Sequence, residues 1–161
     1  MGRKRVNPTH KDLATLKHNP FVNDDFIIRV RKREDPRKFV KDGEEWIKAE
    51  FNQEVETSTR VYNNSEIRQR VALLSHPAAA MLLWIQQELE PSKDYVVINR
   101  QRYVKEHQLQ SETQIIQAMY DLTRYLFICP TLLADVYWVN PKIMFNGNRQ
   151  LKYRKHIKVV D

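Results

Sequence analysis

Polar side chains cluster at the start of one predicted helix. Ser111-Glu112-Thr113-Gln114 open that helix, and behind them Ile115, Met119, Leu122 and Leu126 recur at i, i+4, i+7 and i+11. This spacing is typical of an amphipathic helix. Near a helix start, amides and hydroxyls have the chemistry to bond base edges in the major groove of DNA. The side chains that we expect to contact bases are Glu112, Thr113, Gln114 and Gln117.

These polar groups differ in what each can recognise. The Gln117 amide can form two hydrogen bonds with adenine, and Thr113 offers a hydroxyl to phosphate or a methyl group to thymine. Glu112 only accepts hydrogen bonds and therefore suits cytosine N4. Ser111 and Gln114 have the spacing of a capping box, which satisfies backbone N–H groups at the helix start. The alternative is an ordinary helix that packs on a core and has a polar outer face.

Positive charge is concentrated at both ends of the chain. Residues 1–41 contain 12 Lys and Arg against 5 acidic residues, and residues 139–161 contain 6 against 1, whereas the middle is mildly acidic. Such flanks suit a polyanion, because bound cations release counterions from nucleic acid. Solvated tails that keep the protein soluble are the alternative. The residues that we expect to contact the DNA backbone are Ser111, Arg100, Arg102, Arg124, Lys142, Arg149, Lys152, Arg154 and Lys155.

The elements that would position these side chains follow a recognisable order. Ser75-His76-Pro77 is a predicted helix start, and residues 78–89 are apolar on nearly every face, which indicates a buried helix. Another helix is predicted behind Asn63-Asn64-Ser65. From residue 76 the predicted order is helix, strand, helix, short turn, helix, strand, loop, strand. This order is typical of a winged helix-turn-helix.

We predict an α+β fold in which a winged helix-turn-helix carries an N-terminal β-hairpin extension and has basic arms at both ends. The hairpin is predicted between strands at 46–51 and 55–62, because charges, Pro36 and Gly43 interrupt the β-prone run that begins at Phe26. The predicted divisions are a basic arm at 1–25, a small β extension at 26–62, the DNA-binding domain at 63–149 and a basic tail at 150–161.

Enzyme chemistry finds little support in the sequence. The five histidines have no spacing typical of a zinc site, and the single cysteine, Cys129, lies in a predicted strand. The three glycines exclude a Gly-rich phosphate loop. We therefore expect no enzyme activity, no cofactor and no metal. The longest apolar run, 78–85, is too short for a membrane span, and no secretory signal is evident, so we expect a cytoplasmic protein.

Three pieces of sequence resemble a known family. The first is the apolar 78–89 helix with Tyr95-Val96-Val97-Ile98-Asn99 behind it, and the second is the helix that runs from Ser111 to Leu122. In the third, residues 137–149, a strand runs into Asn140-Pro141 and a turn with Phe145 and Gly147. Together they resemble the RepL type of plasmid replication proteins, a family of winged-helix initiators, over the stretch from Ser75 to Arg149.

The resemblance implies a protein that binds double-stranded DNA at a replication origin and recruits host replication proteins. A transcriptional repressor with the same fold is the closest alternative. A second alternative is a winged helix that binds another protein and not DNA. A homodimer is compatible with the sequence, since the amphipathic segment 65–74 suits either a dimer contact or the protein's own core. We expect no membrane partner.

Overall fold

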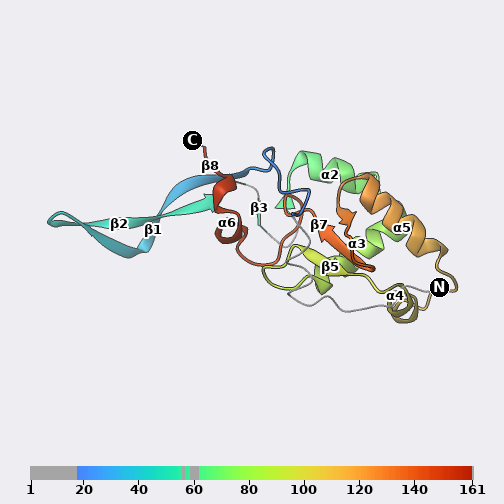
Figure 1. The fold of residues 1–161 in the computed structure, drawn as a ribbon. Helices are drawn as coiled ribbons and strands as arrows, with labels where there is room; N and C mark the ends of the chain where they lie inside the picture. Colours follow the sequence, from blue (N-terminus) through green and yellow to red (C-terminus); the bar gives the residue numbers. More distant parts are fainter. Residues whose placement is uncertain (1–17, 56, 59–61, 161) are drawn as a thin grey trace.

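Residues 18–55, 57–58 and 62–160 are described in the computed structural model, which shows a mixed α+β fold (Figure 1). Its elements in chain order are β1 (Ile28–Asp42), β2 (Glu45–Glu54), β3 (Thr57–Ser58), β4 (Tyr62–Asn63), α2 (Ser65–Ala72), α3 (His76–Glu88), β5 (Tyr95–Val97), α4 (Arg100–Glu106), α5 (Thr113–Arg124), β6 (Ile128–Pro130), β7 (Val136–Val139), α6 (Arg149–Lys152), the 3-10 helix η1 (Arg154–His156) and β8 (Ile157–Val159).

The helix starts are fixed by side-chain caps that the sequence predicts. Asn64 accepts a hydrogen bond from the Ile67 amide at 2.9 Å, and Ser75 accepts one from the Ala78 amide at 3.4 Å. Asn99 caps α4 in the same way by accepting from the Arg102 amide at 3.1 Å. Each cap satisfies an N–H group that has no partner within the helix. The helices predicted behind Asn63-Asn64-Ser65 and at Ser75-His76-Pro77 are confirmed.

The main core lies where α3 and α5 pack on each other and on a small sheet. Met81 and Ile85 of α3 are fully buried, as are Ile115 and Leu122 of α5. The sheet has the order β5-β7-β6, with both neighbours of β7 antiparallel to it. Because β5 precedes α4 and α5 while β6 and β7 follow them, this sheet joins the two ends of the helical segment.

The segment after β7 folds back onto this core. The side chain of Asn140 donates to the Leu126 carbonyl at 2.9 Å and accepts from the Lys142 amide at 3.0 Å. Asn146 donates to the Leu89 carbonyl at 2.7 Å. Ile143 and Met144, which lie between these two asparagines, are buried. The asparagines therefore supply the hydrogen bonds that a buried loop backbone requires.

The N-terminal hairpin differs from the predicted one. Strand β1 continues to Asp42 and pairs with β2, with a bulge between Glu34 and Phe39, so the predicted interruption at 32–43 was wrong. Charges do not end this strand, because nearly all of its side chains past Val30 are exposed to solvent. The turn lies at Gly43-Glu44, where Gly43 has φ of 62°, a value that a two-residue hairpin turn requires and glycine adopts without strain. Figure 1 shows the β1–β2 hairpin projecting from the helical part of the molecule.

The two basic ends of the described chain meet in one sheet. Strand β8 lies parallel to β1 and gives the order β2-β1-β8, with Arg29 beside Lys158. The predicted tail 150–161 and the predicted extension 26–62 therefore share a sheet. Of the predicted arm 1–25, residues 1–17 lie outside the described residues. Asn19 is buried and donates to the Val139 carbonyl at 2.9 Å, which attaches this part of the arm to the core.

Candidate nucleic-acid interface

Helix α5 presents one exposed stripe of side chains. Ile115, Ala118, Met119 and Leu122 are buried, which turns the opposite face of the helix outward. The exposed residues at i, i+3, i+4, i+7 and i+11 are defined here as the α5 stripe: Thr113, Ile116, Gln117, Tyr120 and Arg124. Gln114 and Glu112 are exposed beside its first turn. The four side chains predicted to contact bases therefore all lie on accessible surface at one end of the helix.

The capping box predicted for α5 is not formed. The helix begins at Thr113, one residue later than the box requires, and its N-cap residue Glu112 makes no side-chain capping bond. Ser111 instead accepts a hydrogen bond from the nearby Thr113 amide at 3.4 Å. Glu112 has helical dihedral angles, so the backbone does not take the extended form that a capping residue uses. The Gln114 amide is consequently not held at the helix end by a capping bond.

Helix α4 is fixed against α3, and this sets the start of α5. Tyr103 is buried and stacks on His107 at 3.9 Å between ring centroids, with Trp84 edge-on at 5.1 Å. Gln108 has φ of 51°, and the Leu109 amide bonds back to the Val104 carbonyl at 3.0 Å. This left-handed residue closes α4 and redirects the chain into α5 within a few residues.

The predicted backbone contacts on α4 differ in their surroundings. The Arg102 guanidinium donates to Glu106 at 2.7 Å and lies 3.6 Å from Glu88. That hydrogen bond holds the pKa of the Glu106 carboxyl below its ordinary value, with a second contribution from the Trp84 N–H, which donates at 3.1 Å. Arg102 is nevertheless largely exposed, so this pair does not bury its charge. Arg100 is half-buried at the first position of α4.

Arg124 and Lys142 flank the far end of α5. Arg124 is exposed, with its guanidinium carbon 5.3 Å from the centre of the Tyr125 ring. The Lys142 ammonium lies 3.5 Å from a carboxylate oxygen of Glu66 on α2. Both members of this pair are substantially exposed, so the attraction is screened by water and leaves Lys142 able to change partner.

Arg149 is not a DNA-backbone contact, and this prediction was wrong. Its side chain is 2 % exposed. The Nε atom donates to both carboxylate oxygens of Glu54, at 3.0 and 3.1 Å, and a terminal nitrogen donates to the Pro141 carbonyl at 3.0 Å. The guanidinium thus fastens the base of β2 to the loop after β7. A phosphate has no access to it.

Lys152 is also engaged within the protein. Its ammonium donates to the Ser92 carbonyl at 2.7 Å and lies 3.5 Å from Asp94. The same carboxylate accepts from the Tyr153 hydroxyl at 3.1 Å. Tyr153 is buried, and burial raises the pKa of its phenol. Lys152 and Tyr153 therefore both contact Asp94. The next two cations along the chain, Arg154 and Lys155, are exposed on η1.

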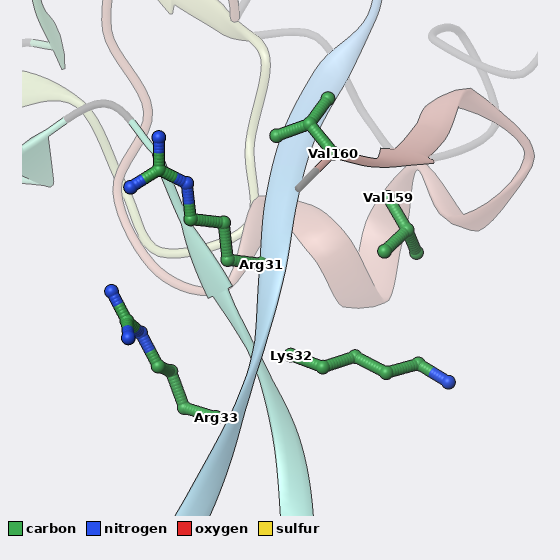
Figure 2. Close-up of a pocket in the computed structure, with 5 residues that line it drawn as sticks. All are labelled: Arg31, Lys32, Arg33, Val159 and Val160. Carbon is green, nitrogen blue, oxygen red and sulfur yellow. The ribbon is translucent and has the colours of Figure 1, made fainter.

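A basic surface lies where β1, η1 and β8 meet, and sequence reasoning found only part of it. We define it as Arg31, Lys32, Arg33, Arg154, Lys155 and Lys158, all of which are exposed. Three of these cations, together with Val159 at the end of β8 and Val160 after it, line a shallow pocket of about 300 Å³ (Figure 2). Figure 2 shows Arg31 and Arg33 on one side of β1 and Lys32 on the other. The excess charge of residues 1–41 was the signal, but only the β1–β8 pairing brings it beside the C-terminal cations.

Within 18–55, 57–58 and 62–160, no three His, Cys, Asp or Glu side chains come together as a metal ion would need. Burial raises the pKa of the Cys129 thiol, which opposes formation of a nucleophilic thiolate. In the same part of the chain, no helix is both long enough and apolar enough to cross a membrane.

Comparison of the chain with models of known protein families, with curated proteins and with solved structures found no match.

Proposed function

We propose that this chain binds double-stranded DNA in a sequence-specific manner, with α5 in the major groove. In this proposal, residues 63–149 form a winged helix-turn-helix. Helices α4 and α5 are its helix-turn-helix pair, and β6 and β7 form its wing. The observation that carries the proposal is the exposed polar end of α5, which follows the short helix α4 after the connection 107–112.

The order and pairing of the elements support this fold. Helix α3 is followed by β5, α4, α5, β6 and β7, and β5 pairs with β7 in the sheet order β5-β7-β6. A winged helix needs this pairing because its first strand must close onto the hairpin that follows the second helix of the pair. The loop between β6 and β7 contains Leu132, which is 90 % exposed, and no cation. We therefore assign phosphate contacts to the basic surface and not to the tip of the wing.

The α5 stripe suits a groove in three ways. Gln117 and Thr113 lie toward the N-terminal end of the helix, which is the end that contacts base edges in this class of protein. Ile116 is 55 % exposed and adds an apolar surface that can pack on thymine methyl groups. Tyr120 carries a hydroxyl that can donate to a phosphate oxygen.

Replacing Gln117 by Ala tests this assignment directly. A bidentate contact to one base contributes about 1–3 kcal/mol of discrimination, so Gln117→Ala is expected to relax preference at one or two base pairs. Affinity for unrelated DNA should remain nearly unchanged. The binding site is first selected from random duplexes with the purified protein, and affinities of all single-base variants are then measured by fluorescence anisotropy.

The matched control is Gln69→Ala, which removes an exposed glutamine from α2. It should leave both the preferred sequence and the affinity unchanged. Uniform weakening on all duplexes after Gln117→Ala would contradict entry of α5 into the groove.

A protein-binding role for α5 is the second candidate, and a specific observation favours it. Ile116 and Tyr120 are 55 % and 65 % exposed and lie one turn apart, a pattern that also suits a partner's apolar groove. Salt dependence separates the two roles. Binding to DNA should weaken steeply between about 50 and 200 mM salt, whereas a protein-binding module should bind duplex weakly at every salt concentration.

Within the DNA-binding class, we propose a replication initiator of the RepL type. The support is the resemblance of Ser75–Arg149 to that family, including the loop that Asn140 and Asn146 hold in place. An initiator would bind the origin and recruit host replication proteins. A plasmid replication assay distinguishes it from a repressor, because deletion of a repressor raises transcription and leaves copying intact.

A further inference from the structure

We propose that the β1–β2 hairpin joins two copies of this chain through the outer edge of β2. Strand β2 lies at the end of the order β2-β1-β8, so no described strand pairs with its outer side. In the dimer, β2 pairs antiparallel with β2 of the second copy and forms one four-stranded sheet, β1-β2-β2-β1. This inference goes beyond the proposed function and requires no DNA.

The hairpin exposes several large apolar side chains, and a third strand, β8, supports only its base, at Ile28–Val30. A two-stranded hairpin is marginally stable in water and needs further strands or a packed face. An exposed apolar edge strand is also a site at which another chain adds. Trp46 is 68 % exposed, and four other large apolar side chains of the hairpin are exposed on its two faces: Phe39, Val40, Ile47 and Phe51.

One hydrogen bond shows which backbone groups of β2 face outward. The side-chain amide of Gln150 on α6 donates to the Asn52 carbonyl at 3.1 Å, from the side of β2 away from β1. In an antiparallel strand, every second residue directs its N–H and C=O groups toward the same edge. The backbone groups of Lys48 and Glu50 therefore also face outward. Gln150 already occupies the edge at Asn52, so pairing with a second copy is confined to residues 47–51.

These outward groups define a two-fold register centred on Ala49. Lys48 of one copy then pairs with Glu50 of the other, and the reverse pair forms by symmetry. On the opposite face, Ile47 lies against Phe51 of the second copy. In this register, opposite charges meet on one face of the sheet and apolar side chains meet on the other. Strand β2 can therefore form the self-complementary contact that a two-fold interface requires.

The charges within one hairpin support the same register. Glu50 lies directly opposite Glu34 in the β1–β2 pairing, and like charges at opposed positions destabilise a sheet. In the dimer, the Lys48 ammonium of the second copy lies on the other side of Glu50. The second copy therefore places a cation directly beside Glu50, whose directly opposed partner within the hairpin is Glu34.

A cysteine placed on the symmetry axis tests the register. In this register, Ala49 lies opposite Ala49 of the second copy as a non-hydrogen-bonded pair. Their Cα atoms would be about 4.5 Å apart, which is within the range of a disulfide. In full-length protein carrying Cys129→Ala, the variant Ala49→Cys should form a covalent dimer under mild oxidation. The control Gln53→Cys should remain uncrosslinked, because the two copies of residue 53 lie beyond opposite ends of the paired segment.

Exchanging charges tests the pairing without a covalent bond. The dimer dissociation constant is measured by sedimentation equilibrium in the absence of DNA. Lys48→Glu and Glu50→Lys should each weaken the dimer about tenfold, because each creates two like-charge pairs. The double variant Lys48→Glu/Glu50→Lys should restore it. Since Glu50→Lys also removes the repulsion with Glu34, a loss of dimer cannot be ascribed to a weaker hairpin.

Three results would overturn the proposal. One is a wild-type protein that stays monomeric at every concentration tested, which would leave the edge to a different partner. Another is a dimer in which Gln53→Cys crosslinks as readily as Ala49→Cys. The third is a double charge variant that stays as weak as either single variant. DNA binding by a monomeric protein would leave the proposed function intact while removing this inference.

Discussion

At the scale of single residues, the Arg149 side chain joins β2 to the loop after β7 through Glu54 and the Pro141 carbonyl. Arg149 belongs to the basic C-terminal region and was expected to bind phosphate, yet it is buried against Glu54, which is distant in sequence. Arginine suits this position because its planar guanidinium can donate to a carboxylate and a carbonyl at once. The same region also supplies Arg154, which is exposed. Nothing in the local sequence distinguishes the two arginines.

Loss of Arg149 should therefore reduce stability and spare DNA binding. Removing one partner of a buried ion pair costs about 3–5 kcal/mol, because the remaining charge is left without compensation. We expect Arg149→Ala to lower the free energy of unfolding in urea by that amount. The control Arg68→Ala, at an exposed position on α2, should cost less than about 1 kcal/mol. A variant of unchanged stability with lost DNA affinity would restore Arg149 as a phosphate contact.

At the scale of elements, apolar periodicity located the buried side of α5 but not its end, because Leu126, the last member of the predicted series, lies beyond the helix and is 51 % exposed. The spacing of Ile115, Met119 and Leu122 predicts the buried side of α5, and all three are buried. The capping-box pattern did not locate the start of α5. The helix begins at Thr113, and Glu112 before it has helical dihedral angles and makes no capping bond. In the N-terminal region, apolar and polar residues alternate only weakly, so the sequence did not indicate where the strands turn. The hairpin turn lies at Gly43 and not at the predicted 52–54.

The two sides of α5 should respond differently to truncation. Leu122 is fully buried, so Leu122→Ala should destabilise the fold by about 2–5 kcal/mol through lost burial and a cavity. Ile116→Ala on the exposed side should change stability by less than about 0.5 kcal/mol. Thermal and urea unfolding measure both. In the described orientation only the Leu122 side of α5 packs on the core. Equal losses of stability at the two positions would therefore contradict this orientation.

At the scale of the whole molecule, the basic surface depends on tertiary pairing. Strand β8 brings Lys158 beside β1, and His156 holds η1 in place by bonding the Phe26 carbonyl at 2.9 Å. Cations from the two ends of the sequence thereby become parts of one sheet. For a protein that binds DNA, such a surface would bind phosphates without reading sequence.

The salt dependence of DNA affinity should report this surface. Each lost phosphate contact lowers the slope of log affinity against log salt by about one, so Arg154→Ala/Lys155→Ala/Lys158→Ala should lower it by up to about three. The control Arg37→Ala/Lys38→Ala/Lys41→Ala removes as many exposed cations from the distal part of β1. If both triple variants lower the slope equally, net charge and not the basic surface accounts for the effect.

The sequence by itself determined the α+β class, most helix positions, and the polar exposed end of α5. These features follow from local periodicity and capping, which act over one or two turns of chain. Only the tertiary structure decided that β1 pairs with β8, that Arg149 is buried on Glu54, and that β2 is left with an open edge. Contacts between residues about 100 positions apart depend on how whole elements pack, and local residue patterns carry little information about that packing.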